Sequence, residues 1–426
     1  MIIPSIDIMN GKAVQLVQGE KMALQAPEDP IALAKQFGLT GEVAVIDLDA
    51  AMGQGDNRDL IKTLCRHAPC RVGGGIRSLE AASDWLNAGA VKVILGTKAE
   101  PAILSQLPRD RVMAAVDMRG GKVAVEGWKT VQETAGLTRM VELRDWVGGF
   151  LVTNIDIEGT MGGFDTAAVA PILDAAATVK LTMAGGITTA QQIAELDKMG
   201  VDAQVGMALY TGKLTIADCL AAMMISDRAD GLWPTVVVDS NHQALGLVYS
   251  NGESLQAALA EGAGIYHSRS RGGLWRKGET SGARQKLLRI AVDCDRDALQ
   301  FTVQQLGDGF CHLGTASCFE ADFDSHGGIS ALAQRIDRAM RADDRQSYTQ
   351  RLLTEPGLLN AKIQEEGGEL ALANSVQEIV AETADVLYFA AVKLAQQHIP
   401  WSAVWDELNS RSRKLARRGG DRKATS

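Results

Sequence analysis

The chain has no uninterrupted run of about 18 apolar residues, and it does not open with a basic segment followed by an apolar one. We therefore expect neither a membrane-spanning helix nor a secretory signal. Cysteine is scarce, with six in 426 residues, which excludes a disulfide scaffold and favours a reducing compartment. Basic residues are not in excess, because the formal net charge is −9, and this argues against a nucleic-acid-binding surface. These absences predict a cytoplasmic protein.

What is present indicates a multidomain globular chain. A length of 426 residues predicts roughly two to four domains. Hydrophobic residues make up 46% and charged residues 22% of the chain, proportions that allow sizeable buried cores.

The first half contains an internal repeat, which is informative before any single motif is considered. Asp7 and Asp117 both belong to a D-x-x-x-G-K pattern and lie 110 residues apart. "IDLDAAMG" from Ile46 resembles "IDIEGTMG" from Ile155, and "GGIRSLEAASDWLNAG" from Gly74 resembles "GGITTAQQIAELDKMG" from Gly185. Matches in the same order at nearly constant offset predict two copies of one unit.

Each copy alternates short apolar runs with amphipathic stretches, which is typical of β/α units around a parallel sheet. Two equal halves favour a closed (β/α)8 barrel over residues 1–225, with its active site at the carboxyl ends of the strands. Asp7 and Asp117 would face each other across that mouth. Glycines after the strands suit two phosphate sites, although tight turns alone would also explain them. The candidate phosphate-binding residues are Gly74, Gly75, Gly96, Thr97, Gly185, Gly186 and Gly206.

Over residues 1–224 the chain resembles the phosphoribosylformimino-5-aminoimidazole carboxamide ribotide isomerases, through "IPSIDIMNGKAVQLVQG", "VGGGIRS" and "DMRGGKVAVEGW". The resemblance implies an Amadori rearrangement of an aldose to a ketose. It makes Asp7 and Asp117 the acid–base pair and sets Thr153 near the reacting sugar. The family usually has Asp-Gly-Thr where this chain has "EGT", so Glu158 replaces a functional aspartate, and its longer side chain can displace the reacting group.

After a linker at 227–234, "TVVVDSNHQALGLVYS" predicts two strands joined by a turn. The stretch "LLRIAVDCDRDALQFTVQQL" has the character of a single strand, so Cys294 should project away from the three neighbouring aspartates. Clustered carboxylates suit Mg2+, and the candidates are Asp293, Asp295 and Asp297. Cys294 has further thiols nearby at Cys311 and Cys318, a set that suits zinc with one open position. The other cysteines, Cys65, Cys70 and Cys219, are expected to be core thiols.

This region, 232–322, closely resembles phosphoribosyl-AMP cyclohydrolase through "YHSRSRGGLWRKGETSG", "DCDRDAL" and "CHLGTASC". The resemblance implies opening of the purine ring at N1–C6, with zinc ligands shared across a homodimer and His312 as a candidate base. Substrate phosphate would meet a set of basic and polar residues: Arg269, Arg271, Arg276, Lys277, Glu279, Thr280 and Ser281.

A charged connector, "RIDRAMRADDRQ", is expected to lead into a helical domain at 347–415. Acidic residues there recur at spacings of three and four, which puts them on one helical face beside apolar residues, where they could bind Mg2+. The pattern E-E-x-x-E then E-x-x-D resembles phosphoribosyl-ATP pyrophosphatase. The residues are Glu365, Glu366, Glu369, Glu382 and Asp385. Gly367 and Gly368 stand where the family has fewer glycines, which predicts a looser helix.

The three resemblances describe consecutive steps of histidine biosynthesis, in reverse order along the chain. They predict a multifunctional enzyme that acts on phosphoribosyl nucleotides and uses Zn2+ and Mg2+. One alternative keeps the two hydrolytic activities and makes the barrel a scaffold. Another treats the zinc as structural and the protein as a nucleotide-binding regulator.

Overall fold

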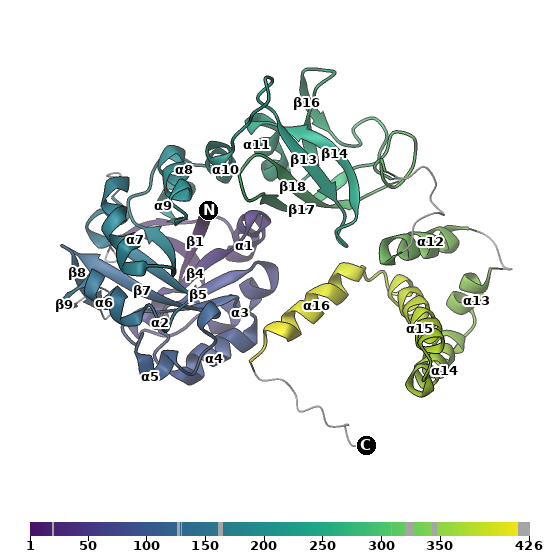
Figure 1. The fold of residues 1–426 in the computed structure, drawn as a ribbon, viewed down its shortest axis with the longest axis horizontal. Helices are drawn as coiled ribbons and strands as arrows, with labels where there is room; N and C mark the ends of the chain where they lie inside the picture. Colours follow the sequence, from purple (N-terminus) through teal and green to yellow (C-terminus); the bar gives the residue numbers. More distant parts are fainter. Residues whose placement is uncertain are drawn as a thin grey trace.

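A computed structural model describes residues 1–18, 21–125, 128, 130–160, 165–307, 309–319, 328–342 and 347–415. These residues form a β/α barrel, then a β-rich unit, then a helical unit (Figure 1). The fold class predicted from the sequence is confirmed.

Eight parallel strands close the barrel, because each pairs with the next and the last pairs with the first. Their side chains are mostly buried on both faces, as expected for a parallel sheet covered by helices. The strands are β1 (Ile2–Met9), β4 (Val43–Asp47), β5 (Cys70–Gly73), β6 (Lys92–Leu95), β7 (Val112–Arg119), β10 (Gly149–Asn154), β11 (Lys180–Ala184) and β12 (Asp202–Val205).

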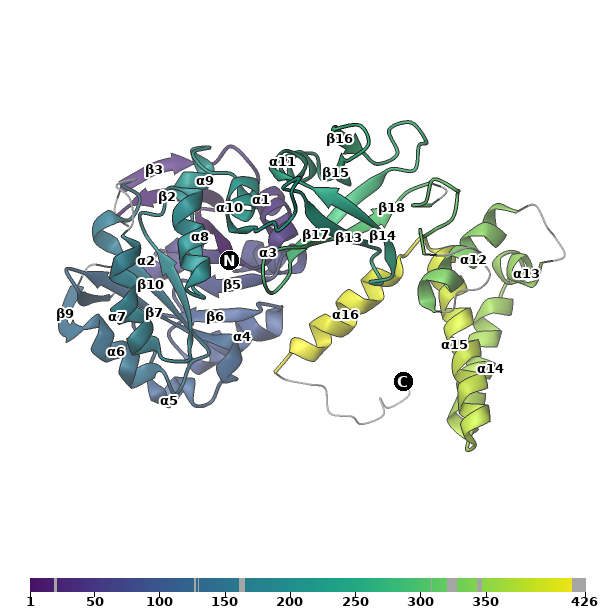
Figure 2. The same cartoon turned by 45° about the horizontal axis from the view of Figure 1, so that its top comes forward.

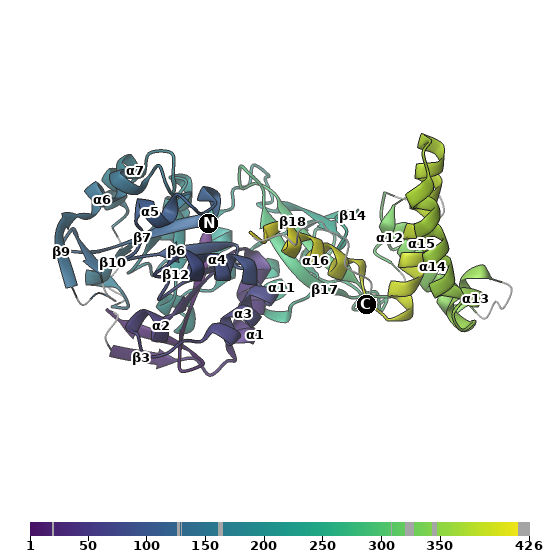
Figure 3. The ribbon, with the colours of Figure 1, turned by 90° about the horizontal axis from the view of Figure 1, so that it is seen from below.

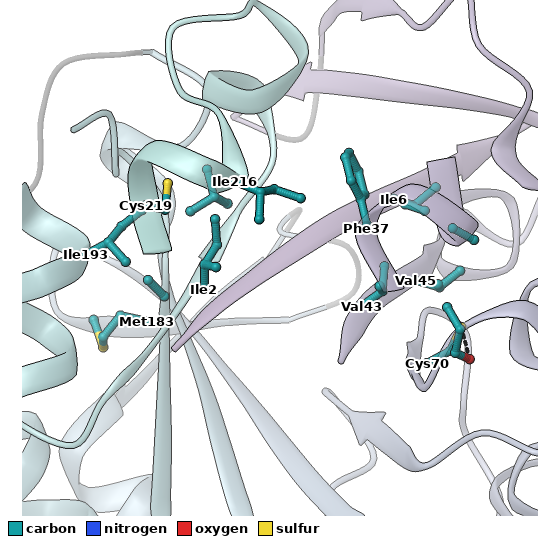
Figure 4. Close-up of a cluster of buried hydrophobic side chains, with 14 of the residues drawn as sticks. Ile2, Ile6, Phe37, Val43, Val45, Cys70, Met183, Ile193, Ile216 and Cys219 are labelled. Atoms are coloured by element: carbon teal, nitrogen blue, oxygen red, sulfur yellow. Dashed lines mark hydrogen bonds between the residues drawn. The ribbon is translucent and has the colours of Figure 1, made fainter. Parts of the chain in front are cut away.

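Helices cover the outside of the ring, and apolar side chains fill the layer between helices and strands (Figure 4). Ile2 and Val43 of the strands lie in this layer with Phe37 and Ile216 of the helices. Cys65, Cys70 and Cys219 are buried thiols of the barrel. The helices are α1 (Pro30–Phe37), α2 (Leu48–Met52), α3 (Arg58–His67), α4 (Leu79–Ala88), α5 (Pro101–Leu104), α6 (Gly136–Leu143), α7 (Ala170–Ala176), α8 (Ala190–Lys198), α9 (Met207–Tyr210) and α10 (Ile216–Met223), with short 3-10 turns η1 (Gly38–Thr40), η2 (Arg109–Arg111), η3 (Ile155–Ile157) and η4 (Thr166–Val169).

Two antiparallel hairpins extend the sheet at positions that match the sequence repeat. The first, β2 (Lys12–Val17) and β3 (Lys21–Gln25), follows β1. The second, β8 (Lys122–Val125) and β9 (Thr130–Ala135), follows β7. Each hairpin therefore begins just after the strand that carries Asp7 or Asp117.

The described residues of the β-rich unit form a six-stranded sheet with one helix, α11 (Gly252–Glu261). The predicted pair of strands is present as β13 (Trp233–Val238) and β14 (Ala244–Ser250), which run antiparallel. The remaining strands are β15 (Ile265–Ser268), β16 (Gly273–Arg276), β17 (Gln285–Val292) and β18 (Leu299–Gln305), in the order β16-β15-β14-β13-β18-β17.

The helical unit contains α12 (Ile329–Arg341), α13 (Tyr348–Thr354), α14 (Leu358–Leu372), α15 (Val376–Gln396) and α16 (Trp401–Arg413). Part of the predicted charged connector is helix α12, whose Ile336 is buried in one cluster with Leu352 and Phe389. The connector prediction was wrong for this stretch because its charged residues occupy one face of a helix and its apolar residues the other. None of the described helices combines the length and apolarity needed to cross a membrane.

Helix α16 runs from the helical unit back towards the barrel (Figures 2 and 3). Trp405 on this helix donates from Nε1 to Asn241 Oδ1 of the β-rich unit at 2.8 Å. At its end, the backbone carbonyl of Arg413 accepts a hydrogen bond from Arg111 of the barrel. The helix therefore contacts all three units.

Candidate active sites

The carboxyl ends of the barrel strands surround a cavity of about 960 Å3, which we call the barrel mouth. Asp7 from β1 and Asp117 from β7 both line it, together with Thr153 and Glu158. Parallel strands bring their carboxyl ends to one face of a barrel, so residues 110 positions apart in the sequence share one cavity. All four predicted catalytic residues of this unit are brought together.

The acid groups of the mouth are poorly solvated, which shifts their protonation towards the neutral form. Burial raises the pKa of Asp7 to about 6, although a hydrogen bond from the Ser5 hydroxyl acts to lower it. Burial and the nearby charges of Asp7 and Asp117 raise the pKa of Glu158 to about 8. Burial also raises the pKa of Asp117. Near neutral pH the mouth can therefore hold a proton donor and a proton acceptor together.

Two residues that hold these acids were not identified from the sequence. Trp128 donates from Nε1 to Asp117 Oδ2 at 2.8 Å. Ser5 donates from Oγ to Asp7 Oδ1 at 2.7 Å. Glu158 differs, because its Oε2 is buried without a hydrogen-bond partner among the described residues. No spacing in the sequence signals the Trp128 contact, since it depends on how the second hairpin folds over the mouth.

The predicted phosphate glycines divide into two groups. Gly74, Gly75, Gly96 and Gly206 line the mouth, as does Thr97, whereas Gly185 and Gly186 are not among its lining residues. Gly74 and Gly185 have nearly equal φ values, +92° and +93° respectively. A Cβ at either one would lie within 2.6 Å of the backbone oxygen of the last residue of the neighbouring strand, Asp47 of β4 or Asn154 of β10. These two glycines are thus required for close backbone approach, whether or not phosphate binds beside them.

Among the described residues, the cations that line the mouth belong to the loops after β5 and β6 and to α6. They are Arg77, which follows Gly75 by two residues, Lys98, which follows Thr97, and Arg139. Arg139 donates to the carbonyl of Ala99, just beyond Gly96 and Thr97. On the opposite side, Glu158 Oε2 is 2.9 Å from where a Cβ of Gly185 would lie. The mouth is therefore electrostatically asymmetric, which the two-fold sequence repeat did not predict.

In the β-rich unit the three predicted Mg2+ ligands lie together. Carboxylate oxygens of Asp293, Asp295 and Asp297 lie within 4.8 Å of one another. The prediction that they alternate along a strand was wrong, because β17 ends at Val292 and the chain turns before β18. Asp293 Oδ1 stabilises this turn by accepting from the backbone N–H of Asp297 at 3.0 Å. A turn is needed because β17 and β18 are antiparallel neighbours.

The turn also changes the position of the thiol. Cys294 Sγ lies 3.9 Å from Asp295 Oδ1, on the same turn as the carboxylates rather than on an opposite face. Three oxygen donors of this kind fit a hard divalent cation such as Mg2+. Asp297 has a raised pKa through its hydrogen bond with Asp293 and the charge of Asp295, as expected for carboxylates that repel each other without a cation.

Cys311 and Cys318 are neighbours, but within one chain Cys294 does not join them. A hydrogen bond from the Leu313 backbone and contact with Cys318 hold the pKa of Cys311 below its ordinary value, which favours the metal-binding thiolate. His312 Nδ1 lies 3.9 Å from Cys311 Sγ. Among the described residues, no three cysteine or histidine ligands lie within 4.8 Å of one another. Two thiols fit zinc in chemistry, and completing the site requires a ligand from elsewhere.

The predicted phosphate residues of this unit are differently engaged. Arg276 forms an ion pair with Glu261 at 2.7 Å, and the guanidinium of Arg269 lies 4.1 Å from the centre of the Tyr249 ring. Lys277 lies over Phe310 and interacts with the charges of Cys311 and Cys318, and burial lowers its pKa. Arg271, Glu279, Thr280 and Ser281 are exposed on the surrounding turns. Lys277 therefore lies beside the two thiols, a position that its predicted role in binding phosphate did not imply.

The helical unit gathers acids from two antiparallel neighbours, α14 and α15. Oxygens of Glu366, Glu382 and Asp385 lie within 4.8 Å of one another. Burial, and then the charge of Glu369, raise the pKa of Glu382, so Glu369 is part of the same group. Lys362 pairs with Glu366 at 2.7 Å and with Glu365 at 3.0 Å, but Glu365 is not one of the clustered acids. Four of the five predicted acids thus form one cluster that fits Mg2+.

The two glycines inside α14 have open space around them, since an added Cβ at Gly367 or Gly368 would meet nothing within 4 Å. We expect Gly367→Ala and Gly368→Ala each to raise the free energy of unfolding by about 0.5–1 kcal/mol, because alanine loses less backbone entropy in a helix. Thermal and urea unfolding of the helical unit would measure this.

The matched control is Gly357, which precedes the same helix with a φ of +81° and equally open surroundings. Gly357→Ala should lower stability, because alanine is strained in that conformation. If all three variants shifted stability in one direction, the helical explanation would be wrong.

Comparison with known families gives three matches in order along the chain. The family model described as histidine biosynthesis protein matches residues 1–215. Models for phosphoribosyl-AMP cyclohydrolase and phosphoribosyl-ATP pyrophosphohydrolase match residues 246–320 and 329–412.

Curated relatives point the same way. A histidine biosynthesis trifunctional protein of Saccharomyces bayanus is 46% identical over 229 residues, covering 53% of this chain and 28% of that protein. A histidine biosynthesis bifunctional protein of Schizosaccharomyces pombe is 44% identical over 215 residues, covering 50% of this chain and 49% of that protein. An imidazole-4-carboxamide isomerase of Methanocaldococcus jannaschii is 36% identical over 233 residues, covering 52% of this chain and 98% of that protein. The chain spans about a quarter of the length of the trifunctional relatives it matches.

Proposed function

Because the chain belongs to the histidine biosynthesis protein family, we propose that it catalyses three steps of that pathway. The helical unit hydrolyses phosphoribosyl-ATP to phosphoribosyl-AMP and diphosphate. The β-rich unit opens the purine ring of phosphoribosyl-AMP at N1–C6. The barrel isomerises the resulting aminoaldose to the ketose. Each unit has residues whose chemistry suits its step.

The observation that carries most weight is the barrel mouth. An aldose–ketose rearrangement needs a proton delivered to the sugar ring oxygen, which breaks its bond to C1, and then a proton removed from C2, the carbon next to C1. Asp7 and Asp117 line one cavity from opposite sides of the ring of strands, and burial raises the pKa of both. Thr153 interacts with Asp117 and is available to orient the sugar hydroxyls. The cations on one side suit a substrate phosphate.

The pH dependence of isomerisation tests the role of Glu158. The rate should rise as Asp7 loses its proton near pH 6 and fall as Glu158 ionises near pH 8, because the new charge would add to that of Asp7 in a mouth that binds an anionic substrate. Glu158→Gln cannot ionise, so its fall near pH 8 should disappear while the rate at pH 7 stays within about tenfold. Initial rates of ketose formation from pH 5 to 9 would measure this.

Glu142→Gln is the control, because Glu142 lines the same mouth at its rim and its side chain is half exposed. It should keep the fall near pH 8. A fall that persisted in Glu158→Gln would show that another group titrates.

In the β-rich unit, Asp293, Asp295 and Asp297 would hold Mg2+, and the cysteines would hold zinc. Bound zinc supplies an activated water for ring opening. His312 lies beside Cys311 and can accept a proton from the reacting water. Arg269, Arg271 and Arg276 offer positive charge to the substrate phosphate, and Lys277 lies beside the thiols.

Completion of the zinc site by a second copy of the chain makes the active protein a homodimer. Cys294 and Cys318 are exposed thiols, unlike the buried cysteines of the barrel. The apolar residues Leu313 and Phe319 beside them are 76% and 66% exposed. An apolar surface around incomplete ligands is consistent with coverage by a partner that also supplies a ligand.

In the helical unit, the cluster of Glu366, Glu369, Glu382 and Asp385 would hold Mg2+, which neutralises charge on the substrate's phosphate chain. Glu382 Oε2 is buried without a hydrogen-bond partner among the described residues, so a cation would relieve an otherwise costly group. The residues can then orient water towards the phosphorus that is attacked. A cytoplasmic location suits these substrates and the chain's free thiols.

One alternative is favoured by a specific observation. Glu158 replaces the aspartate usual in the family that the barrel resembles, so the barrel could be a scaffold for two hydrolytic units. A Glu158→Asp variant that gained much isomerase activity would favour this alternative.

The deciding experiment supplies purified protein with phosphoribosyl-ATP, Mg2+ and Zn2+ and follows products by mass-resolved chromatography. The last step conserves mass, so aldose and ketose must be separated by retention against standards. Accumulation of ketose supports three active units, and accumulation of aldose supports the scaffold alternative. Arrest at phosphoribosyl-AMP would contradict the proposed ring opening.

A further inference from the structure

The turn that carries the three aspartates is attached to the barrel. Arg296, in the middle of this turn, makes two hydrogen bonds to Asp197 of α8, from Nε to Oδ2 at 2.8 Å and from Nη2 to Oδ1 at 2.9 Å. The Asp197 side chain is only 9% exposed. A paired, two-bond contact between guanidinium and carboxylate fixes direction as well as distance.

The same arginine holds the turn from inside. Its Nη1 donates to the backbone carbonyl of Asp293 at 2.7 Å, and its own carbonyl accepts from the N–H of Ile225, just after α10, at 2.7 Å. Arg296 adopts a φ of +69°, a conformation that a non-glycine residue keeps only when its surroundings hold it there. The barrel thus contacts both the side chain and the backbone of Arg296.

Three carboxylates within 4.8 Å repel one another when no cation is bound. The hydrogen bonds of Asp293 to the backbone of Asp297 and Ala298 close the turn, but both are accepted by Asp293 alone. The contact of Arg296 with the barrel adds a second support for the arrangement of the three carboxylates.

We propose that Asp197 of the barrel is a positioning residue for the divalent-cation site of the β-rich unit, acting through Arg296. This inference rests on the proposed function of the three aspartates. It gives the barrel a role in ring opening that does not depend on its own isomerase activity. By linkage, cation binding at the turn should in return strengthen the contact between the two units.

The test measures Mn2+ binding, as a spectroscopic substitute for Mg2+, in the full-length protein by electron paramagnetic resonance of the free ion. A background of Glu366→Gln with Glu382→Gln removes the acid cluster of the helical unit. In that background Asp197→Asn should weaken Mn2+ binding by about 10- to 100-fold, the loss typical when a partner that orients metal ligands is removed. Asp174→Asn, at an exposed aspartate of α7, is the matched control and should bind within twofold of the background.

Arg296→Gln removes the same ion pair from the other side and should weaken Mn2+ binding to a similar extent. Arg296→Gln leaves Asp197 in place, so it still tests the inference if Asp197→Asn fails to fold. The double variant should be no weaker than Arg296→Gln alone, because Asp197 acts on the turn through Arg296.

Asp295→Asn separates failure of this inference from failure of the proposed site. If Asp295→Asn left Mn2+ binding unchanged, the three aspartates would not be the cation site. If Asp295→Asn abolished binding while Asp197→Asn and Arg296→Gln bound within twofold of the background, the inference alone would be overturned.

Discussion

Asp117→Asn should lower the rate of isomerisation by about 100- to 10,000-fold, the usual contribution of a general acid or base. Asparagine keeps the size of the side chain and its contact with Trp128, but it cannot exchange a proton. The same variant should convert phosphoribosyl-ATP through the first two steps at an unchanged rate, because the proposed function assigns those steps to the other two units. The aldose should therefore accumulate, which chromatography against standards would detect.

The control for this variant is Asp110→Asn. Asp110 is an exposed residue of the turn that precedes β7, so it lies at the opposite end of the strand that carries Asp117. It should form ketose at the unmodified rate. Ketose formation by Asp117→Asn at more than about a tenth of that rate would remove Asp117 from the catalytic pair.

Cys318→Ser should abolish ring opening, with a loss of at least about 100-fold, because a metal ligand contributes more than the neighbours that orient it. The variant should still release diphosphate from phosphoribosyl-ATP, so phosphoribosyl-AMP should accumulate. Metal analysis of the purified protein should find less zinc than in the unmodified chain. Cys311→Ser should behave in the same way, since the two thiols are neighbours.

Cys65→Ala is the control that tests whether loss of an unrelated thiol also lowers zinc content and ring opening. Cys65 is a buried residue of the barrel, far along the chain from Cys311 and Cys318. The variant should keep both its zinc content and its ring-opening rate. Normal zinc content in both Cys318→Ser and Cys311→Ser would contradict the proposed ligands.

Where patterns are local or repeated, the sequence predicted the structure well. The repeat that relates Asp7 to Asp117 predicted a closed barrel with both acids at one mouth, because strand order and alternation follow from the chain itself. Helical spacing likewise predicted the acid cluster of α14 and α15, which includes Glu366 and Glu382.

The sequence failed where a local pattern was compatible with two structures. The alternating residues 293–297 look like a strand, but the chain reverses there, and Arg296 takes a conformation that no sequence pattern reveals. The charged residues 335–341 look like a connector, yet Ile336 packs in the helical core. In both cases contacts with distant residues decided the outcome.

The sequence alone determined which chemical groups the chain contains, the order of its three units, the strands that carry Asp7 and Asp117 and the helices that carry the acid cluster of the helical unit. These depend on residue type and spacing along one chain. The tertiary structure decided which groups meet: Trp128 with Asp117, Lys277 with the thiols, and Asp197 of the barrel with Arg296 of the next unit. Such contacts join residues that no periodicity relates, because they form only when separate elements pack against each other.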